Sequence, residues 1–204
     1  MSVILHLDSS PRALRSHSRQ LSRAFVDVWK QTHPQDTVIY RDLGHQPPPH
    51  VDEAWIGSAY TSPDARTLEL KEAVRVSDEL IDEVLAADLV VLGAPMHNFG
   101  ITSSLKTYLD QIIRVGRTFD YPSYDGLATG KKLVVLTARG GSGYGPGEPM
   151  HAMNLQEPTI KTLFGFIGIT DIKFLHHEKT SQGNGELESS IARVKSLAAE
   201  INLN

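Results

Sequence analysis

The sequence predicts an α/β fold in which a single parallel sheet carries helices on both faces. Short apolar runs alternate along the chain with longer segments whose apolar residues recur at the helical period. Strands that alternate with helices in this way become parallel neighbours in a sheet. The runs are almost continuously apolar, which is typical of strands covered on both faces. We expect five strands, at 3–7, 37–40, 88–93, 133–137 and 171–175.

Helices are expected in the intervals that follow the strands. The first is predicted at 18–31, where Leu21, Phe25 and Trp29 lie on one face. Pro158 falls in the first turn of a later helix, where its missing N–H costs nothing. The later helices are predicted at 68–85, 102–115, 158–166 and 186–201.

Composition limits what this chain can do. Its 204 residues suit one domain spanning 1–204, and a net charge of −4 without basic runs argues against a nucleic-acid partner. The chain has no cysteine, so redox chemistry requires a bound cofactor. The spacing of His45 and His50 does not predict a metal site. The chain has neither a signal-like start nor an apolar run of roughly 18 residues, so we expect a cytoplasmic protein that does not engage a membrane.

Three segments interrupt the alternation of strands and helices. Residues 44–66 form a Pro-rich stretch, 116–130 contains several aromatic residues, and 138–153 is rich in glycine. Loops of this length in a compact domain are usually functional or mobile. We find no internal repeat and no domain linker.

The loop after the first strand has the composition of an anion site. In open α/β sheets, ligands bind beyond the carboxyl ends of the strands, and helix N-termini attract anions. Ser16 or Ser18 could instead be a simple helix N-cap. Neither a Walker loop nor a GxGxxG fingerprint occurs here. The clustering of hydroxyl and guanidinium groups favours a phosphate; the residues are Ser9, Ser10, Ser16, Ser18, Arg12, Arg15 and Arg19.

Two further loops leave the same predicted edge. A turn after the third strand does not need Met96 and Phe99, so these residues suggest a flat, partly apolar ligand, with ordinary core packing as the alternative. The loop after the fourth strand is rich in glycine, which fits either a flexible turn or close approach of backbone N–H groups to a ring. A planar ligand that also carries a phosphate satisfies all three loops. Flavin mononucleotide (FMN) is such a ligand.

The chain resembles the FMN-dependent NADH:azoreductases, flavodoxin-like enzymes that also reduce quinones. The resemblance covers almost the full length, and rests on "SSPRALRSHSRQLS", "APMHNFGITSSLKTYLD", "TFDY", "GLATGKK", "LTARGG" and "TLFGFIGITDIKF". It implies the strand order 2-1-3-4-5 of the flavodoxin-like fold and a homodimer with one FMN per subunit. It also implies ping-pong chemistry, in which NADH or NADPH reduces the flavin and leaves before an azo compound or quinone takes the hydride.

The resemblance also assigns residues to the site. No side chain is expected to be catalytic; the backbone at Asn98 and Gly141 would tune the ring. His97 and His17 depart from the tyrosine and glutamine often found at these places, and His97 is expected to act indirectly. The substrate pocket is predicted at Phe119, Tyr121 and Phe166. The expected cofactor-binding residues are Ser10, Ser16, His17, Ser18, Met96, His97, Asn98, Phe99, Arg139, Gly140 and Gly141.

The sequence also allows two alternative functions and predicts where several histidine and aromatic side chains lie. A flavodoxin-like electron carrier and a non-catalytic flavin sensor are alternatives to an enzyme, although carriers are usually more acidic than this chain. His176 and His177, at the end of the fifth strand, are expected at the surface. The aromatic residues of the irregular segments, Trp55 and Tyr60 among them, are expected to be covered by a partner subunit, with packing on their own subunit as the alternative.

Overall fold

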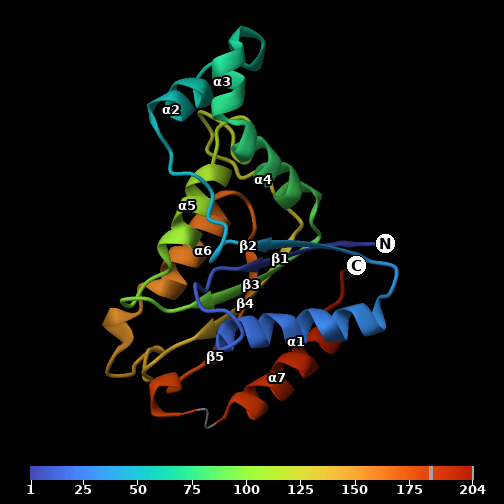
Figure 1. Cartoon of the computed structure of the whole chain (residues 1–204), viewed down its shortest axis with the longest axis vertical. Coiled ribbons are helices and arrows are strands. Elements are labelled where there is room, and N and C mark those ends of the chain that lie inside the picture. The colour runs from blue at the N-terminus through green and yellow to red at the C-terminus, as the bar shows by residue number, and fades with distance from the viewer. Residues whose placement is uncertain (184–185, 204) are drawn as a thin grey trace.

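The sheet has the predicted parallel strands in the predicted order. The computed structural model describes residues 1–183 and 186–203. Its five strands are ordered β2-β1-β3-β4-β5, and every neighbouring pair is parallel. Figure 1 shows the sheet between two helical layers. The strands are β1 (Val3–Asp8), β2 (Thr37–Asp42), β3 (Leu89–Pro95), β4 (Lys132–Ala138) and β5 (Asp171–His177).

Helices cover both faces of the sheet. On one face lie α1 (His17–Thr32) and α7 (Leu187–Glu200), which bury one apolar cluster against the strands. On the other lie α4 (Arg75–Ala86), α5 (Ser103–Ile112) and α6 (Gln156–Phe166), which bury a second. Two burial faces explain the nearly continuous apolar runs of the inner strands. Among the described residues, no helix has the length and apolarity needed to span a membrane.

The strand register brings the three candidate loops to one edge. Asp8 of β1 lies opposite both Asp42 of β2 and Gly93 of β3. Ala138 of β4 lies opposite Pro95 of β3 and His177 of β5. Because parallel strands end at a common edge, the segments that follow β1, β3 and β4 begin side by side there.

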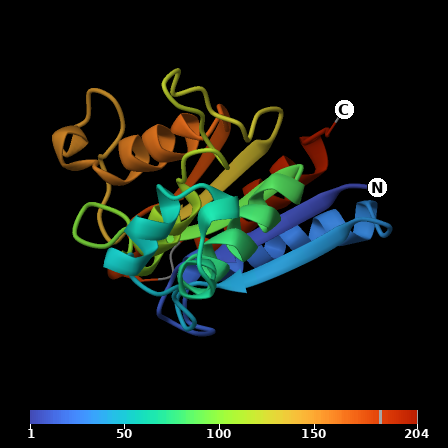
Figure 2. The same ribbon diagram turned by 90° about the horizontal axis from the view of Figure 1, so that it is seen from above.

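A small helical arm extends from the α4–α5 side of the molecule (Figures 1 and 2). The expectation of one helix over 68–85 is wrong, because the chain bends at Val74, where φ is −105° and ψ is 5°. Val74 is fully buried against Trp55 and Ala59 in a third apolar cluster, so the bend lets its side chain join the arm. The short elements are α2 (Glu53–Ala59), α3 (Leu68–Ala73) and the 3₁₀ turns Pro63–Ala65, His151–Met153 and Thr180–Gln182.

Trp55 is buried within its own chain, without a partner subunit. Its side chain is 9% exposed, and its indole Nε1 donates a hydrogen bond to Gln111 Oε1 at 2.8 Å. The Gln111 amide Nε2 donates in turn to the Pro49 carbonyl at 2.9 Å. For Trp55 the alternative of packing on its own subunit therefore holds, since α2 places the ring against α5 of the same chain. Tyr60 remains 81% exposed on its own chain.

Candidate cofactor site

The first loop gathers its serines at the N-terminus of α1. Ser10, Ser16 and Ser18 are all at most 3% exposed, and His17 between the last two is half-buried. Ser16 is the N-cap of α1 and accepts the Arg19 backbone N–H at 3.4 Å, so the capping alternative holds for this residue. The Ser16 and Ser18 hydroxyl oxygens lie 3.2 Å apart. Hydroxyls so placed at a helix N-terminus can donate to an anion, which capping alone does not require.

His177 is buried beside this loop, so the expectation that it lies at the surface is wrong. Its side chain is 2% exposed because β5 continues to the inner side of α7. Its Nε2 lies 3.1 Å from His17 Nδ1, and its Nδ1 lies 3.0 Å from Ser190 Oγ. Burial, followed by the nearby His17, lowers the pKa of His177. These contacts connect the first loop to β5 and α7. No sequence pattern predicts them, because His17 and His177 lie far apart in the chain.

The second loop contains a tight, strained turn. His97 and Gly100 exchange backbone hydrogen bonds of 3.1 and 2.9 Å, and the two residues between them have positive φ: 46° for Asn98 and 69° for Phe99. Asn tolerates this conformation, whereas for Phe99 it costs about 1–3 kcal/mol. The Phe99 carbonyl is held by the Leu155 N–H at 3.1 Å. Strain that the surroundings maintain in this way is typical of ligand sites.

The backbone of this turn keeps a free donor. Among the described residues, the N–H of Asn98 has no hydrogen-bond partner. Met96 and Phe99 are each partly buried, so they are neither core residues nor fully solvated. The Met96 N–H donates to the Ala138 carbonyl at 2.8 Å, which joins the second loop to the third. A flat ligand resting here would meet two apolar side chains and an unused N–H.

Arg139 lies beneath the third loop rather than on its surface. Its side chain is 1% exposed and its Nε donates to Gln156 Oε1 at 3.2 Å. Gln156 Nε2 donates to the Ala94 carbonyl at 3.1 Å, so this buried residue links α6 to β3. The guanidinium also lies 5.6 Å from the Tyr144 ring centroid and pairs with Glu178 at 3.5 Å. Arg139 and Gln156 thus support the loop, and sequence reasoning missed Gln156 because a lone glutamine carries no motif.

Gly140 and Gly141 present backbone at the surface of this loop. Their carbonyls accept hydrogen bonds from the N–H groups of Ser181 and Lys179, at 3.3 and 3.0 Å. Within the described part of the chain, their own N–H groups have no partner. A Cβ added to Gly141 would lie 3.0 Å from the Tyr144 hydroxyl, so the Tyr144 side chain would have to shift slightly to admit it. The loop therefore offers two donors with little side-chain bulk.

The predicted cofactor residues lie on one edge of the sheet. The Ser9 N–H donates to the Gly93 carbonyl at 3.0 Å, and Ser104 Oγ donates to the Ser9 carbonyl at 3.3 Å. Together with the Met96–Ala138 bond, these contacts connect all three loops. Buried hydroxyls at a helix N-terminus suit a phosphate, and free N–H groups beside apolar side chains suit a polar-edged ring. The donor set therefore fits FMN.

The predicted substrate-pocket residues cluster elsewhere. The ring centroids of Phe119 and Phe166 are 4.8 Å apart, and Tyr121 packs edge-on against Tyr124 at 5.6 Å. Tyr121 is 64% exposed and Phe166 36%. Helices α5 and α6 both start near the loops and carry the chain away, over about 15 Å, before this cluster. Phe119, Tyr121 and Phe166 thus gather at the end of α6 opposite Gln156, the residue that bonds to Ala94 at the sheet edge.

Stability should fall as the pH is lowered through the range in which histidine titrates. Burial, followed by the charge of Arg139, lowers the pKa of His176 to about 4. The expectation that this residue lies at the surface holds only in part, since its side chain is 30% exposed. A folded-state pKa below the unfolded value means that the unfolded chain binds the proton first. The stabilisation is therefore complete above about pH 6.5 and is lost toward about pH 4.

Urea unfolding at several pH values checks this. We expect His176→Gln to remove at least about 1 kcal/mol of the stability difference between about pH 7 and about pH 5, since one unit of pKa shift corresponds to about 1.4 kcal/mol. Carboxylates with lowered pKa values act mainly below this window. An unchanged pH dependence in the variant would contradict the assignment.

The parallel sheet and the three loops at its edge are typical of flavin-binding proteins with a flavodoxin-like fold. Sequence comparison assigns the chain to this class. Residues 2–200 match the family described by its flavodoxin-like fold, so the chain belongs to that family. The chain is 54% identical over 188 residues to the FMN-dependent NADH:quinone oxidoreductase of Nostoc punctiforme, covering 91% of each chain. It is 53% identical to FMN-dependent NADH:quinone oxidoreductase 2 of Trichormus variabilis, covering 98% of each. The crystal structure of an azoreductase from Bacillus anthracis superimposes with a TM-score of 0.85 at 30% identity, covering 98% of both chains.

Proposed function

We propose that this protein is an FMN-dependent oxidoreductase that passes reducing equivalents from NADH or NADPH to quinones and azo compounds. The observation that carries the proposal is the convergence of a hydroxyl-lined helix N-terminus, a strained apolar turn and a glycine loop on one sheet edge. The relatives named above, two quinone oxidoreductases and an azoreductase, support it. We also propose a cytoplasmic location, because the reduced nicotinamide nucleotides that serve as donors are intracellular.

Each loop has its own task. Ser10, Ser16 and Ser18 donate to the phosphate, assisted by the positive end of the α1 dipole. Met96 and Phe99 support the ring, while the N–H groups of the turn and of the glycine loop donate to its polar edge. Bound FMN supplies hydride acceptance and hydride release; the chain supplies position and electrostatics. His97 is exposed and closes the turn with its backbone, which supports an indirect role for its side chain.

The acceptor pocket is completed, in this proposal, by a second copy of the chain. The cluster of Phe119, Tyr121, Tyr124 and Phe166 is partly exposed and gathers around the C-terminal end of α6, a helix about 15 Å long. Exposed aromatic groups of this kind are enriched where another surface packs. Sedimentation at micromolar concentration should therefore show a particle of twice the chain mass. A fully active monomer would exclude the shared pocket.

Phe119→Ala should change acceptor turnover more than FMN affinity. The ring lies in the exposed cluster, against Phe166 and away from the phosphate loop, so its loss should lower kcat/KM for quinone about tenfold, an effect of about 1.4 kcal/mol. Phe119→Tyr keeps the ring and serves as the matched control. Steady-state kinetics and flavin titration measure the two quantities. Unchanged kinetics for every acceptor would remove Phe119 from the pocket.

Cofactor identity gives the direct test of the proposal. The purified protein should be yellow, and acid should release FMN, identified by its mass and absorbance. Recovery of FAD alone, or failure to bind added FMN, contradicts the proposal. A carrier is distinguished from an enzyme by steady oxidation of NADH with a water-soluble quinone, which a carrier does not sustain.

A further inference from the structure

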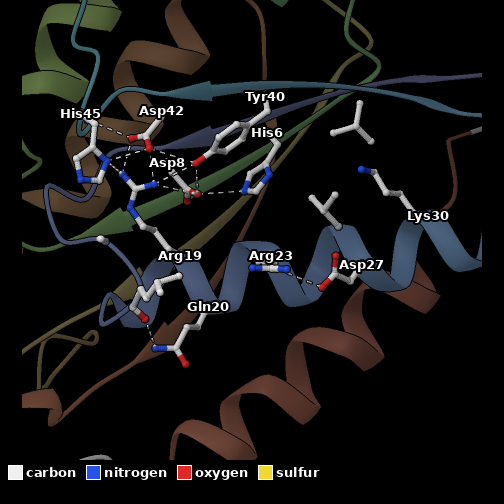
Figure 3. Close-up of a pocket in the computed structure, with 14 residues that line it drawn as sticks. His6, Asp8, Arg19, Gln20, Arg23, Asp27, Lys30, Tyr40, Asp42 and His45 are labelled. Carbon is white, nitrogen blue, oxygen red and sulfur yellow. Dashed lines mark hydrogen bonds and ion pairs between the residues drawn. The ribbon is translucent and has the colours of Figure 1, made fainter.

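A charged cluster lies just behind the first loop, on the side of α1 that faces β2. It lines one end of a cavity of about 600 Å³ between α1 and the sheet. Figure 3 shows Arg19 reaching from α1 toward Asp42, with Asp8, Tyr40, His6 and His45 around it. Ala13 and Leu14 of the first loop also line this cavity, and Arg19 contacts the loop from the cavity side.

Arg19 is bonded to the first loop itself. Its Nε and Nη2 donate to the Ser10 carbonyl at 3.1 and 2.6 Å. Ser10 is one of the predicted phosphate-binding residues, and its own hydroxyl accepts the Arg12 N–H at 3.2 Å. Arg19 lies in the first turn of α1, so these bonds close a short loop between the end of β1 and the helix. The guanidinium therefore fixes one peptide of the loop from behind.

The other side of the guanidinium is held by carboxylates. Nη1 donates to Asp42 Oδ2 at 2.9 Å, Nη2 pairs closely with Asp42 Oδ1, and Asp8 Oδ2 lies 3.7 Å from Nη1. Burial by itself raises the pKa of Asp42, but the bonds from Arg19 and His45 outweigh it and hold that pKa far below its usual range. Arg19 is only 12% exposed and its donors are used. These carboxylates neutralise the charge of Arg19, and its N–H groups are not available to a ligand. This differs from the expectation that Arg19 binds the phosphate.

Gly44 shows how tightly the two segments meet. A Cβ built on Gly44 would lie 1.9 Å from the Ser10 carbonyl oxygen and 2.8 Å from Arg19 Nη2. The Gly44 N–H donates to the Asp8 carbonyl at 3.1 Å. The backbone after β2 is therefore pressed against the same peptide that Arg19 holds.

We propose that Arg19 is a positioning residue for cofactor binding, which clamps the Ser10 peptide to Asp42 and so holds the first loop in the shape that receives the FMN phosphate. The inference rests on the proposed function, which names the cofactor. Without the guanidinium, the Ser10 carbonyl loses both donors, and two carboxylates face the loop unneutralised. Both effects oppose a dianion and leave the ring loops untouched.

The test compares FMN with riboflavin, which lacks the phosphate. Arg19→Gln should weaken FMN binding to the apoprotein by about tenfold or more while riboflavin affinity changes by less than about threefold, since charge-assisted bonds order the phosphate loop only. The phosphorus NMR signal of bound FMN should move toward that of free FMN. Arg41→Gln is the matched control, because Arg41 on β2 pairs with Glu79 and Glu83 and does not contact Ser10. This control should leave the affinity ratio and the signal unchanged.

Asp42→Asn distinguishes a clamp on the Ser10 peptide from simple sequestration of Arg19 by Asp42. It also provides the test by itself if Arg19→Gln does not fold. The clamp predicts weaker FMN binding, because the guanidinium loses its bidentate anchor. Stronger FMN binding would mean that Asp42 merely withholds Arg19 from the phosphate, and would overturn the proposal. Equal losses for FMN and riboflavin, or wild-type affinity in Arg19→Gln, would overturn it too while leaving the proposed function standing. Failure of the wild-type chain to bind FMN would overturn both.

Discussion

The double variant Ser16→Ala, Ser18→Ala should bind FMN at least about a hundredfold more weakly than the wild type. Each hydroxyl that donates to a dianion contributes about 1.5–3 kcal/mol, and about 1.4 kcal/mol corresponds to a tenfold change in affinity. Both side chains are buried at the N-terminus of α1, with their oxygens 3.2 Å apart. Riboflavin has no phosphate, so its affinity should change far less. Flavin titrations of the apoprotein measure both constants.

Ser16 is also an N-cap, so the double variant needs a control for lost helix stability. Thr67 caps α3 by the same bond, accepting the Leu70 N–H at 3.3 Å, and lies in the exposed arm. Thr67→Ala should cost about 1 kcal/mol of stability at most and leave both flavin affinities unchanged. Equal losses of FMN and riboflavin binding in the double serine variant would mean that this loop does not hold a phosphate.

Gly44→Ala should destabilise the protein by about 3 kcal/mol and weaken FMN binding at the same time. The added methyl group would meet the Ser10 carbonyl oxygen at 1.9 Å and its carbon at 2.5 Å. These are backbone atoms, so either the first loop or the segment after β2 has to move. Urea unfolding measures the stability loss, and flavin titration measures the consequence for the site.

Gly57→Ala is the matched control for this substitution. Gly57 lies in α2, and the nearest atom to its added Cβ is a Leu70 methyl carbon at 4.0 Å. Alanine is a better helix former than glycine, so this variant should be neutral or more stable by up to about 1 kcal/mol. A Gly44→Ala protein as stable as Gly57→Ala, with wild-type FMN affinity, would show that the two segments are not packed as described.

The sheet and its functional edge could be predicted because their signals are local. Apolar runs at 3–7 and 133–137 mark buried strands, and strand order then places the following loops side by side. Two large apolar residues in a loop, Met96 and Phe99, predicted that this turn has a special role. They did not predict the left-handed backbone at Asn98 and Phe99. The prediction of one helix over 68–85 failed at Val74. The spacing of Val74 suits a continuous helix, but its side chain packs in the apolar cluster of the arm.

The supporting contacts could not be predicted because they join residues far apart in the chain. His17 and His177 are separated by 160 positions, and Arg139 and Gln156 by 17. The sequence predicts Arg19 in the first loop's anion site, but only the fold shows that Asp42 pairs with its guanidinium. Periodicity reports which face of an element is buried; it does not report which polar groups meet there.

Anaerobic mixing of the FMN-loaded protein with NADH, followed by a water-soluble quinone, tests the central claim most directly. The site proposed here should lose its yellow absorbance with NADH alone and regain it when quinone is added, with one NADH oxidised per quinone reduced. Both steps should be fast enough to account for steady turnover. Absorbance that NADH does not bleach, or that quinone does not restore, would contradict an oxidoreductase built on these three loops.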